Sequence, residues 1–367
     1  MNYLVTGGAG FIGSHLAEYL TSFNHKVTIL DNLSTGSLTN LIHCKDFKFI
    51  NGDILNKTDI ENAIQGCDWV IHLAAAVGVK LVTEKPAETF KVNMEGTINV
   101  LESSLAHKAR VFLASTSETY GKSVKVPFKE DDDRLIGPTN IIRWGYATSK
   151  IADEYMAMAY YKEKRLPVII GRFFNTVGPR QVSTYGMVIP RLVEQAIKGQ
   201  DLTIYGDGKQ TRCFGSVDDA VAAIYKLTRS PKAIGQVVNI GNEEEVQIKE
   251  LAKRVINLTG SKSKIKFIPF SKVFEPGFED MQRRVPDTAK LKKLTGFAFS
   301  TKLDQIIKSV IASMQIPVNP VAPIRRSYKG NGTNLARTGV KKDSRTSRNL
   351  PVWTTRYKSI RSNVEKS

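Results

Sequence analysis

Short apolar runs and stretches with helical spacing alternate along the first 175 residues of the chain. Continuous apolar runs predict buried parallel strands at residues 3–5, 27–31, 47–50, 69–76, 109–114 and 168–175. Apolar positions three and four residues apart predict helices at 14–20, from about 57, at 90–106 and at 144–160. Strands and helices that alternate in this way predict an α/β fold built on a doubly wound parallel sheet.

This alternation breaks down after residue 175. The pattern predicts a helix at 185–198, a short strand at 202–205 and a turn at 206–212. From residue 316 onward no apolar period remains, and prolines, glycines and basic residues are scattered. We therefore expect a first domain at 1–175, a smaller, mainly C-terminal domain at 176–315 with an interleaved boundary, and a basic low-order tail at 316–367.

The turn that follows the first strand is rich in glycine. Gly7, Gly10 and Gly13 form a GxxGxxG pattern that overlaps a GxGxxG pattern beginning at Gly8. Glycine permits the dihedral angles of a tight turn, leaves room for a ligand beside the backbone, and lets the next helix point its N–H groups at an anion. Strand, glycine turn and helix in this order predict that residues 1–175 form a Rossmann domain that binds a dinucleotide pyrophosphate.

An acid closes the second strand, where the adenosine ribose is expected. The carboxylate of Asp31 would accept hydrogen bonds from a ribose 2′-hydroxyl and repel a 2′-phosphate, so NAD is favoured over NADP. Asp53, after the third strand, is expected either to reach the adenine or to cap the helix that begins near Lys57. The full set of expected contacts from these turns and strand ends is Gly7, Gly10, Phe11, Ile12, Gly13, Asp31, Asn32, Asp53, Ile54, Leu73, Ala74 and Ala75.

Chemically active side chains follow the fifth strand and open the long helix after it. The fifth strand runs into Thr116, Ser117 and Glu118, at the usual ligand position of a parallel sheet. Tyr146 and Lys150 are four residues apart and share one helix face. An ammonium one turn from a phenol favours the phenolate and lowers its pKa, which predicts that Tyr146 acts as a general base.

Together these motifs resemble the extended short-chain dehydrogenases/reductases, in particular the NAD-dependent nucleotide-sugar epimerases, dehydratases and decarboxylases, over about residues 1–315. The resemblance implies that Tyr146 and Lys150 are a catalytic pair that also contacts the cofactor, and that Thr116 or Ser117 hydrogen-bonds the sugar O4. It implies that Asn93 supports the active-site helix beside the cofactor. It further implies a UDP-linked sugar substrate, a homodimer, no metal, and substrate contacts at Asn175, Arg180, Arg212 and Arg284.

The resemblance leaves more than one reaction open. All begin with oxidation at the sugar C4, in which Tyr146 takes the hydroxyl proton and NAD takes the hydride. A 4-epimerase returns the hydride to the other face of the ketone. A uronate decarboxylase loses carbon dioxide from the resulting β-keto acid, helped by a carboxylate and an arginine. A 4,6-dehydratase usually needs an Asp-Glu pair, and Ser117-Glu118 lacks the Asp.

The choice between a 4-epimerase and a decarboxylase rests on short runs of residues that resemble one class or the other. The run Thr116-Ser117-Glu118 with Arg284 resembles the decarboxylase pattern, whereas the context of Tyr146 and the run 185–191 resemble the 4-epimerases. A 4-epimerase acting on a UDP-hexose is the leading expectation, and a UDP-glucuronate decarboxylase that makes UDP-xylose is the alternative. A dehydratase is less favoured because the Asp of its Asp-Glu pair is missing, and a protein that binds NAD without turnover is less favoured because Tyr146, Lys150 and Ser117 are all present.

Composition narrows the setting. The net charge of +18 is concentrated in residues 316–367, which carry twelve Lys and Arg against two acids and leave only +8 for the first 315 residues. A nucleic-acid partner is therefore not favoured, and the partner of the tail stays open. The three cysteines have no metal-ligand spacing, no apolar run is long enough to span a membrane, and no signal peptide is expected before the glycine turn. We expect a cytoplasmic protein.

Overall fold

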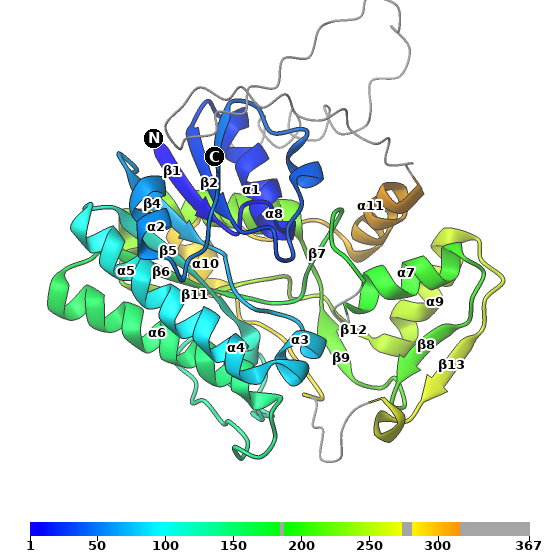
Figure 1. Cartoon of the computed structure of the whole chain (residues 1–367). Helices are drawn as coiled ribbons and strands as arrows, with labels where there is room; N and C mark the ends of the chain where they lie inside the picture. Colours follow the sequence, from blue (N-terminus) through cyan, green and yellow to red (C-terminus); the bar gives the residue numbers. More distant parts are fainter. Residues whose placement is uncertain (184–186, 274–280, 316–367) are drawn as a thin grey trace, which may run out of the picture.

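The computed structural model describes residues 1–183, 187–273 and 281–315 (Figure 1) and leaves out the side chains of 79–81. The tail expected at 316–367 and the start of the helix expected at 185–198 lie outside the described residues.

A seven-stranded parallel sheet in the order β11-β6-β5-β4-β1-β2-β3 forms the larger lobe. The chain starts in the middle of the sheet, builds outward to β3, and then crosses back to β4 and onward, which is the doubly wound arrangement. The prediction of an α/β Rossmann sheet is therefore confirmed. The strands are β1 Asn2–Thr6, β2 Lys26–Asp31, β3 Phe47–Asn51, β4 Trp69–His72, β5 Arg110–Thr116, β6 Val168–Phe173 and β11 Gln236–Ile240.

Helices cover both faces of this sheet, so its strands are apolar on both sides (Figure 1). In β1, Tyr3 and Val5 pack toward one face, and Leu4 packs toward the other. The first face carries α1 Phe11–Ser22, α8 Val217–Thr228 and α10 Ala289–Thr295, and the second carries α2 Lys57–Ile64, α5 Gly96–Ala106 and α6 Trp144–Lys164.

The smaller lobe lies at the right of Figure 1 and has its own apolar core. Leu192, Leu251 and Ile307 belong to this core, one from each of its helices. Those helices are α7 Val188–Ile197, α9 Ile248–Thr259 and α11 Leu303–Gln315. The strand pairs are β8 Leu202–Tyr205 with β13 Ile265–Ile268, β9 Thr211–Cys213 with β12 Glu245–Gln247, and β7 Thr176–Val177 with β10 Gly215–Ser216.

The chain crosses between the lobes more than once. After the smaller lobe has begun, the chain returns through α8 and β11 to the large sheet, where β11 pairs with β6. A segment within 176–315 therefore completes the sheet begun by the first 175 residues.

Three local elements differ from the sequence expectations. The helix expected at 90–106 is divided into α4 Pro86–Phe90, one turn of π-helix at Lys91–Glu95, and α5, and it is preceded by α3 Val79–Glu84. The strand expected at 69–76 ends at His72. Arg212, expected in a turn, lies in the short strand β9.

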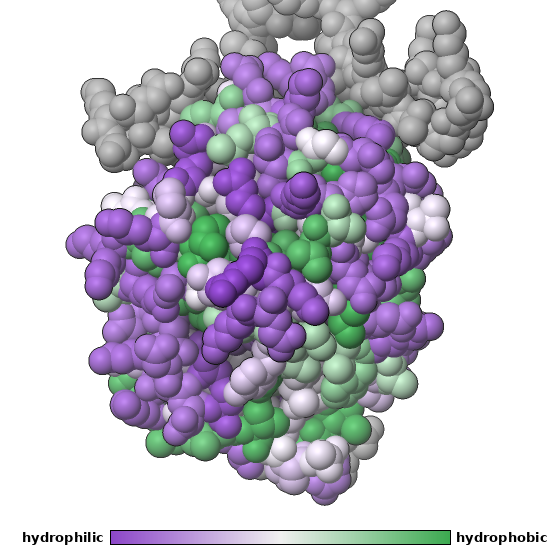
Figure 2. All heavy atoms as spheres, turned by 90° about the vertical axis from the view of Figure 1, so that its left-hand side faces the viewer, coloured by the Kyte–Doolittle hydropathy of each residue, from purple (hydrophilic) through white to green (hydrophobic). Residues whose placement is uncertain are grey.

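The surface seen in Figure 2, which faces left in Figure 1, is mainly hydrophilic with separate apolar patches. On α6, Tyr155 is 74% exposed and Met156 is 37% exposed. Among the described residues, no helix combines the length and the apolar character that crossing a membrane requires.

Candidate active site

The glycine turn leaves backbone open at the C-terminal edge of the sheet. Gly7 has a φ of +68°, and a Cβ there would lie 2.8 Å from the backbone nitrogen of Ala74. A Cβ on Gly13 would collide with the carbonyl oxygen of Gly7. Only glycine fits both positions, because one requires a left-handed backbone and the other a close contact between helix and turn. The resulting cradle, free of side chains at the start of α1, suits a pyrophosphate.

Asp31 fixes the shape of this turn. Its carboxylate accepts hydrogen bonds from the backbone N–H of Ala9 at 2.9 Å and of Leu33 at 2.8 Å. Burial raises the pKa of Asp31, and the two backbone donors oppose that rise. Each carboxylate oxygen keeps a further lone pair for a ribose hydroxyl. The cofactor contact of Asp31 stays a prediction.

The two roles considered for Asp53 are separated by the structure. Asn56 caps α2 by accepting a hydrogen bond from the Thr58 N–H at 3.0 Å, so the expectation that Asp53 caps this helix is wrong. Asp53 instead accepts a hydrogen bond from the Asn32 side chain at 2.9 Å, beside the ends of β2 and β3. That place is compatible with the adenine contact.

Asn93 connects the segment after β4 to the active-site helix. It lies in the π-helical turn, where it accepts a hydrogen bond from Ala76 N–H at 2.8 Å and donates to the Ser149 hydroxyl at 3.1 Å. Ser149 donates in turn to the carbonyl of Tyr146. This geometry agrees with the supporting role implied for Asn93. Phe11 and Ile12 open α1, and Leu73, Ala74 and Ala75 follow β4.

Ile54 has a packing role. It is buried, and a Cβ on Gly96 would collide with it. Its predicted contact with the cofactor remains untested.

Glu118 lies between two arginines from distant parts of the chain. Its carboxylate pairs with Arg143 at 3.1 Å and with Arg284 at 3.0 Å. Burial alone would raise the pKa of Glu118, but these two arginines, with Arg212 farther away, lower it to about 2. We call Glu118, Arg143, Arg212 and Arg284 the charge cluster; it carries three cations against one carboxylate.

Tyr146 lies beside this cluster. Its hydroxyl hydrogen-bonds to Thr116, and the charges of Glu118 and Arg284 both act on it. Burial and the negative charges of Glu118 and Asp153 raise the pKa of Tyr146. The pKa of Tyr146 is therefore raised in this structure, and not lowered as the helical spacing predicted. The Lys150 ammonium donates to Asp153 at 2.8 Å.

Ser117 is buried at the end of β5, and its hydroxyl oxygen has no hydrogen-bond partner within the described residues. A buried hydroxyl without a partner is costly unless a ligand satisfies it. Thr116 already accepts a hydrogen bond from the Glu118 N–H at 3.2 Å and bonds to Tyr146. Both hydroxyls therefore remain candidates to contact the substrate.

The four predicted substrate residues do not all gather at one place. Arg284 and Arg212 belong to the charge cluster. The Asn175 side chain donates to the carbonyl of Cys213 at 2.9 Å, which ties the end of β6 to the smaller lobe. Arg180 pairs with Glu18 on α1 at 2.6 Å and donates to Ser14, so the structure assigns it to α1 and not to the cluster.

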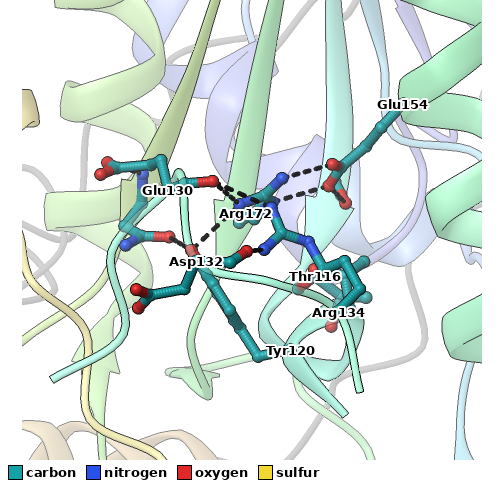
Figure 3. A network of polar contacts seen from close by, with 10 residues as sticks. Thr116, Tyr120, Glu130, Asp132, Arg134, Glu154 and Arg172 are labelled. Atoms are coloured by element: carbon teal, nitrogen blue, oxygen red, sulfur yellow. Dashed lines mark hydrogen bonds and ion pairs between the residues drawn. The ribbon is translucent and has the colours of Figure 1, made fainter. Parts of the chain in front are cut away.

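A second, deeply buried network supports the strand end from behind (Figure 3). Arg172 on β6 forms a two-pronged ion pair with Glu154 on α6, at 2.8 and 2.6 Å, and donates to the Tyr120 hydroxyl and the Glu130 carbonyl. Ser115 also donates to Glu154. This network fixes α6 relative to β5 and β6, and thereby holds Tyr146 opposite Thr116.

Sequence reasoning missed two charged residues of the site, Arg143 and Asp153. Arg143 precedes Tyr146 by three residues, and Asp153 follows Lys150 by three. Residues three apart on a helix share a face, so the spacing itself was a usable signal. Within the described residues, no group of three His, Cys, Asp or Glu side chains is arranged to hold a metal ion.

This arrangement can act on an alcohol and on an anion together. Tyr146 and Thr116 offer hydroxyl groups at one point, and Arg284 of the charge cluster presents positive charge beside it. A substrate with a hydroxyl at the first point and a carboxylate or phosphate at the second would match both.

Comparison with known proteins agrees with this geometry. The sequence model described as GDP-mannose 4,6 dehydratase matches residues 4–310. The chain is 45% identical over 310 residues to the UDP-N-acetyl-alpha-D-glucosaminuronate decarboxylase of Bacillus cytotoxicus, covering 84% of this chain and 96% of that one. It is 37% identical to the UDP-glucuronic acid decarboxylase 1 of Danio rerio, covering 84% and 71% of the two chains.

Solved structures with the same fold include an epimerase. The UDP-glucuronic acid 4-epimerase of Bacillus cereus, in complex with UDP-glucuronic acid and NAD, superimposes with a TM-score of 0.76 at 30% identity, covering 86% of this chain and 99% of that one.

Proposed function

This chain belongs to the extended short-chain dehydrogenases/reductases that the GDP-mannose 4,6-dehydratase model describes, and from that premise we propose that it decarboxylates a UDP-linked uronic acid with NAD as its cofactor. Members of this family modify nucleotide sugars, and the particular reaction proposed here rests on the charge cluster.

The observation that carries the proposal is the position of Glu118 between Arg143 and Arg284, next to Tyr146. The charge of Arg212 also acts on Glu118. A hexose carries a neutral hydroxymethyl group at C6, whereas a uronic acid carries a carboxylate there. An arginine is well suited to bind that carboxylate, because its planar guanidinium can donate two parallel hydrogen bonds.

Tyr146 accounts for the proton transfers at O4, and the proton that C5 gains comes from solvent. Tyr146 takes the proton of the C4 hydroxyl, and Thr116 and Ser117 orient that hydroxyl. The resulting 4-ketone makes the C6 carboxylate a β-keto acid, so the C5–C6 bond breaks and its electron pair moves into a C4 enolate as carbon dioxide leaves. C5 is then protonated, the C4 hydride is restored, and Tyr146 returns its proton to O4. The sum consumes one proton and converts a uronate into a pentose plus carbon dioxide.

When bound, NAD would supply the hydride acceptor for the oxidation at C4 and the hydride for the later reduction. The residues that would hold it are the glycine cradle at Gly7 and Gly13, Asp31 at the ribose, and the segment at Ala74. Glu118 is ionised at neutral pH because its pKa is about 2, so it does not donate a proton to C5. We assign it an electrostatic role beside the arginines.

The leading expectation from the sequence, a 4-epimerase, is supported less well than its alternative. The 45% and 37% identical relatives are both named as decarboxylases. The UDP-glucuronic acid 4-epimerase of similar fold is 30% identical, and its structure holds UDP-glucuronic acid. A carboxylate-binding cluster suits either enzyme, so the reaction must be tested directly.

The test is to incubate the purified protein separately with UDP-N-acetylglucosaminuronate, UDP-glucuronate, UDP-glucose and UDP-N-acetylglucosamine. We expect carbon dioxide release and a UDP-pentose from a uronate, with the N-acetylated uronate preferred because the most similar of the cited relatives is named for it. Mass spectrometry identifies the loss of the carboxyl group, and NMR identifies the configuration at C4. A 4-epimer of either uronate without carbon dioxide would overturn the proposal in favour of an epimerase.

A further inference from the structure

A chain of buried polar side chains runs behind Lys150. The Lys150 ammonium and the Asp153 carboxylate form an ion pair of 2.8 Å, one turn apart on α6, and the two side chains are 3% and 1% exposed. Tyr146 lies one turn before Lys150 on the same helix. Asp153 therefore pairs with the cation that lies one turn after the predicted base on α6.

The contacts continue from Asp153 into the sheet. The Thr97 hydroxyl on α5 hydrogen-bonds to the Asp153 carboxylate. The same hydroxyl lies 3.2 Å from Nε2 of His72, and Nδ1 of His72 lies 2.8 Å from the Thr6 hydroxyl. Thr6 accepts a hydrogen bond from the Ala74 N–H at 3.3 Å. The chain therefore ends at the backbone that contacts Gly7 in the glycine cradle.

The number of available protons fixes the direction of these bonds. A carboxylate only accepts, so Thr97 gives its single proton to Asp153 and must accept from Nε2–H of His72. Nδ1 of His72 then accepts the Thr6 proton, which leaves Thr6 free to accept from Ala74. Burial and the nearby Lys150 charge lower the pKa of His72 to about 3, in agreement with a neutral ring that donates at one nitrogen and accepts at the other.

The neighbouring carboxylate on α6 belongs to a different network. Glu154 is committed to Arg172 and Ser115 (Figure 3). Its negative charge still acts on Asp153, whose pKa is raised mainly by burial and lowered by Lys150 and Thr97. The charges that act on Tyr146 are Glu118, Asp153 and Arg284. Asp153 is thus the carboxylate that pairs with Lys150, whereas Glu154 pairs with Arg172.

We propose that Asp153 is a positioning residue that holds the Lys150 ammonium in place for Tyr146, and that Thr97 and His72 link this carboxylate to the glycine cradle. The ion pair and the burial of both side chains fix where the ammonium lies relative to the preceding turn of α6. Without a correctly placed ammonium, the phenolate of Tyr146 forms only at higher pH. The inference rests on the oxidation at C4 in the proposed function, a step that decarboxylase and epimerase share.

The test measures NADH formation in a single turnover as a function of pH, using whichever UDP-sugar the native protein oxidises. In Asp153→Asn we expect the single-turnover rate to fall by about tenfold to a hundredfold. The rising limb of the pH profile, where the rate increases with pH, should shift to higher pH by about one unit, and the affinity for the sugar should stay unchanged. Asp153→Glu keeps the charge and is expected to recover part of the rate. Asp219→Asn is the matched control, because it removes a buried carboxylate on α8 that accepts hydrogen bonds from the backbone N–H of Ser300 and Thr301. It is expected to lower the melting temperature without shifting the rising limb of the pH profile.

Thr97→Val provides a second route if Asp153→Asn does not fold. It removes one hydrogen bond from Asp153 at nearly constant volume, and the limb should move in the same direction by a smaller amount. An unshifted limb in Thr97→Val, together with an unshifted or unfolded Asp153→Asn, would overturn the proposal. Because NADH formation precedes carbon dioxide release, a native protein that oxidises a sugar without releasing carbon dioxide would refute the decarboxylase assignment and leave this test intact.

Discussion

Replacing Glu118 by glutamine removes the single negative charge of the charge cluster and keeps the size of the side chain. The pKa of Glu118 is about 2, so at neutral pH the substitution changes its charge by a full unit. Glutamine can still hydrogen-bond to Arg143 and Arg284. The variant therefore tests the charge of Glu118 more than its shape.

The magnitude follows from the geometry. A uronate carboxylate bound to the far side of Arg284, which pairs with Glu118 at 3.0 Å, would lie roughly 7 Å from the Glu118 charge. At an effective dielectric constant of about 20, two unit charges at that distance repel by about 2.4 kcal/mol, or roughly 50-fold in an equilibrium or a rate. The repulsion is present in the bound uronate and disappears as neutral carbon dioxide leaves. Glu118→Gln should therefore lower both KM and kcat by up to about 50-fold and change kcat/KM little.

Steady-state kinetics of carbon dioxide release measure both constants, and NAD content and melting temperature establish that the variant is folded. The matched control is Glu245→Gln, which removes the carboxylate that pairs with Arg283 at 2.7 Å. Arg283 is the sequence neighbour of Arg284, but its side chain is half exposed to solvent. Both constants should stay unchanged in the control. An unchanged kcat in Glu118→Gln, or a KM that rises, would show that Glu118 does not act by repelling the substrate carboxylate.

Three further outcomes are expected. Tyr146→Phe should retain NAD and lose turnover by about a hundredfold to ten thousandfold, because the acid–base group is gone; near-normal turnover would exclude Tyr146 as the base. Asp31→Ser should weaken the preference for NAD over NADP by about tenfold or more, measured by binding of both cofactors, and an unchanged ratio would remove Asp31 from the ribose site. Stability should fall as pH drops from about 6.5 toward 3, because His72 binds a proton in the unfolded state that the folded state excludes. It should fall again from about 4.5 toward 2, because Glu118 is protonated more readily in the unfolded state than in the folded state. A melting temperature that stays constant from neutral pH to pH 4 would contradict this reasoning.

The central sheet and the glycine turn could be predicted because their signals are local. Buried parallel strands are continuous apolar runs, and Gly7 and Gly13 stand where only glycine fits. The sequence alone did not reveal that Asn56 caps α2, because Asp53 and Asn56 are both residue types that cap helices, and the choice depends on the residue at which the helix begins.

The polar contacts of the site were harder to predict, because they join residues far apart in the sequence. Glu118 and Arg284 were both singled out, but their ion pair spans 166 positions, and nothing local indicated that Arg143 would complete it. The pairing of Lys150 with Asp153 was within reach of helical spacing. The raised pKa of Tyr146 could not be predicted from spacing, because it depends on the burial of the side chains.

The return of the chain through α8 and β11 also bears on how the protein is made. A ribosome releases β1 to β6 well before α8 and β11, so the growing chain has an open strand edge at β6 and an uncovered apolar face beside α1. Those surfaces are covered only after part of the smaller lobe has been synthesised. A gene divided after residue 175 would therefore yield a first fragment prone to aggregation, and both fragments would have to be produced together to rebuild the sheet.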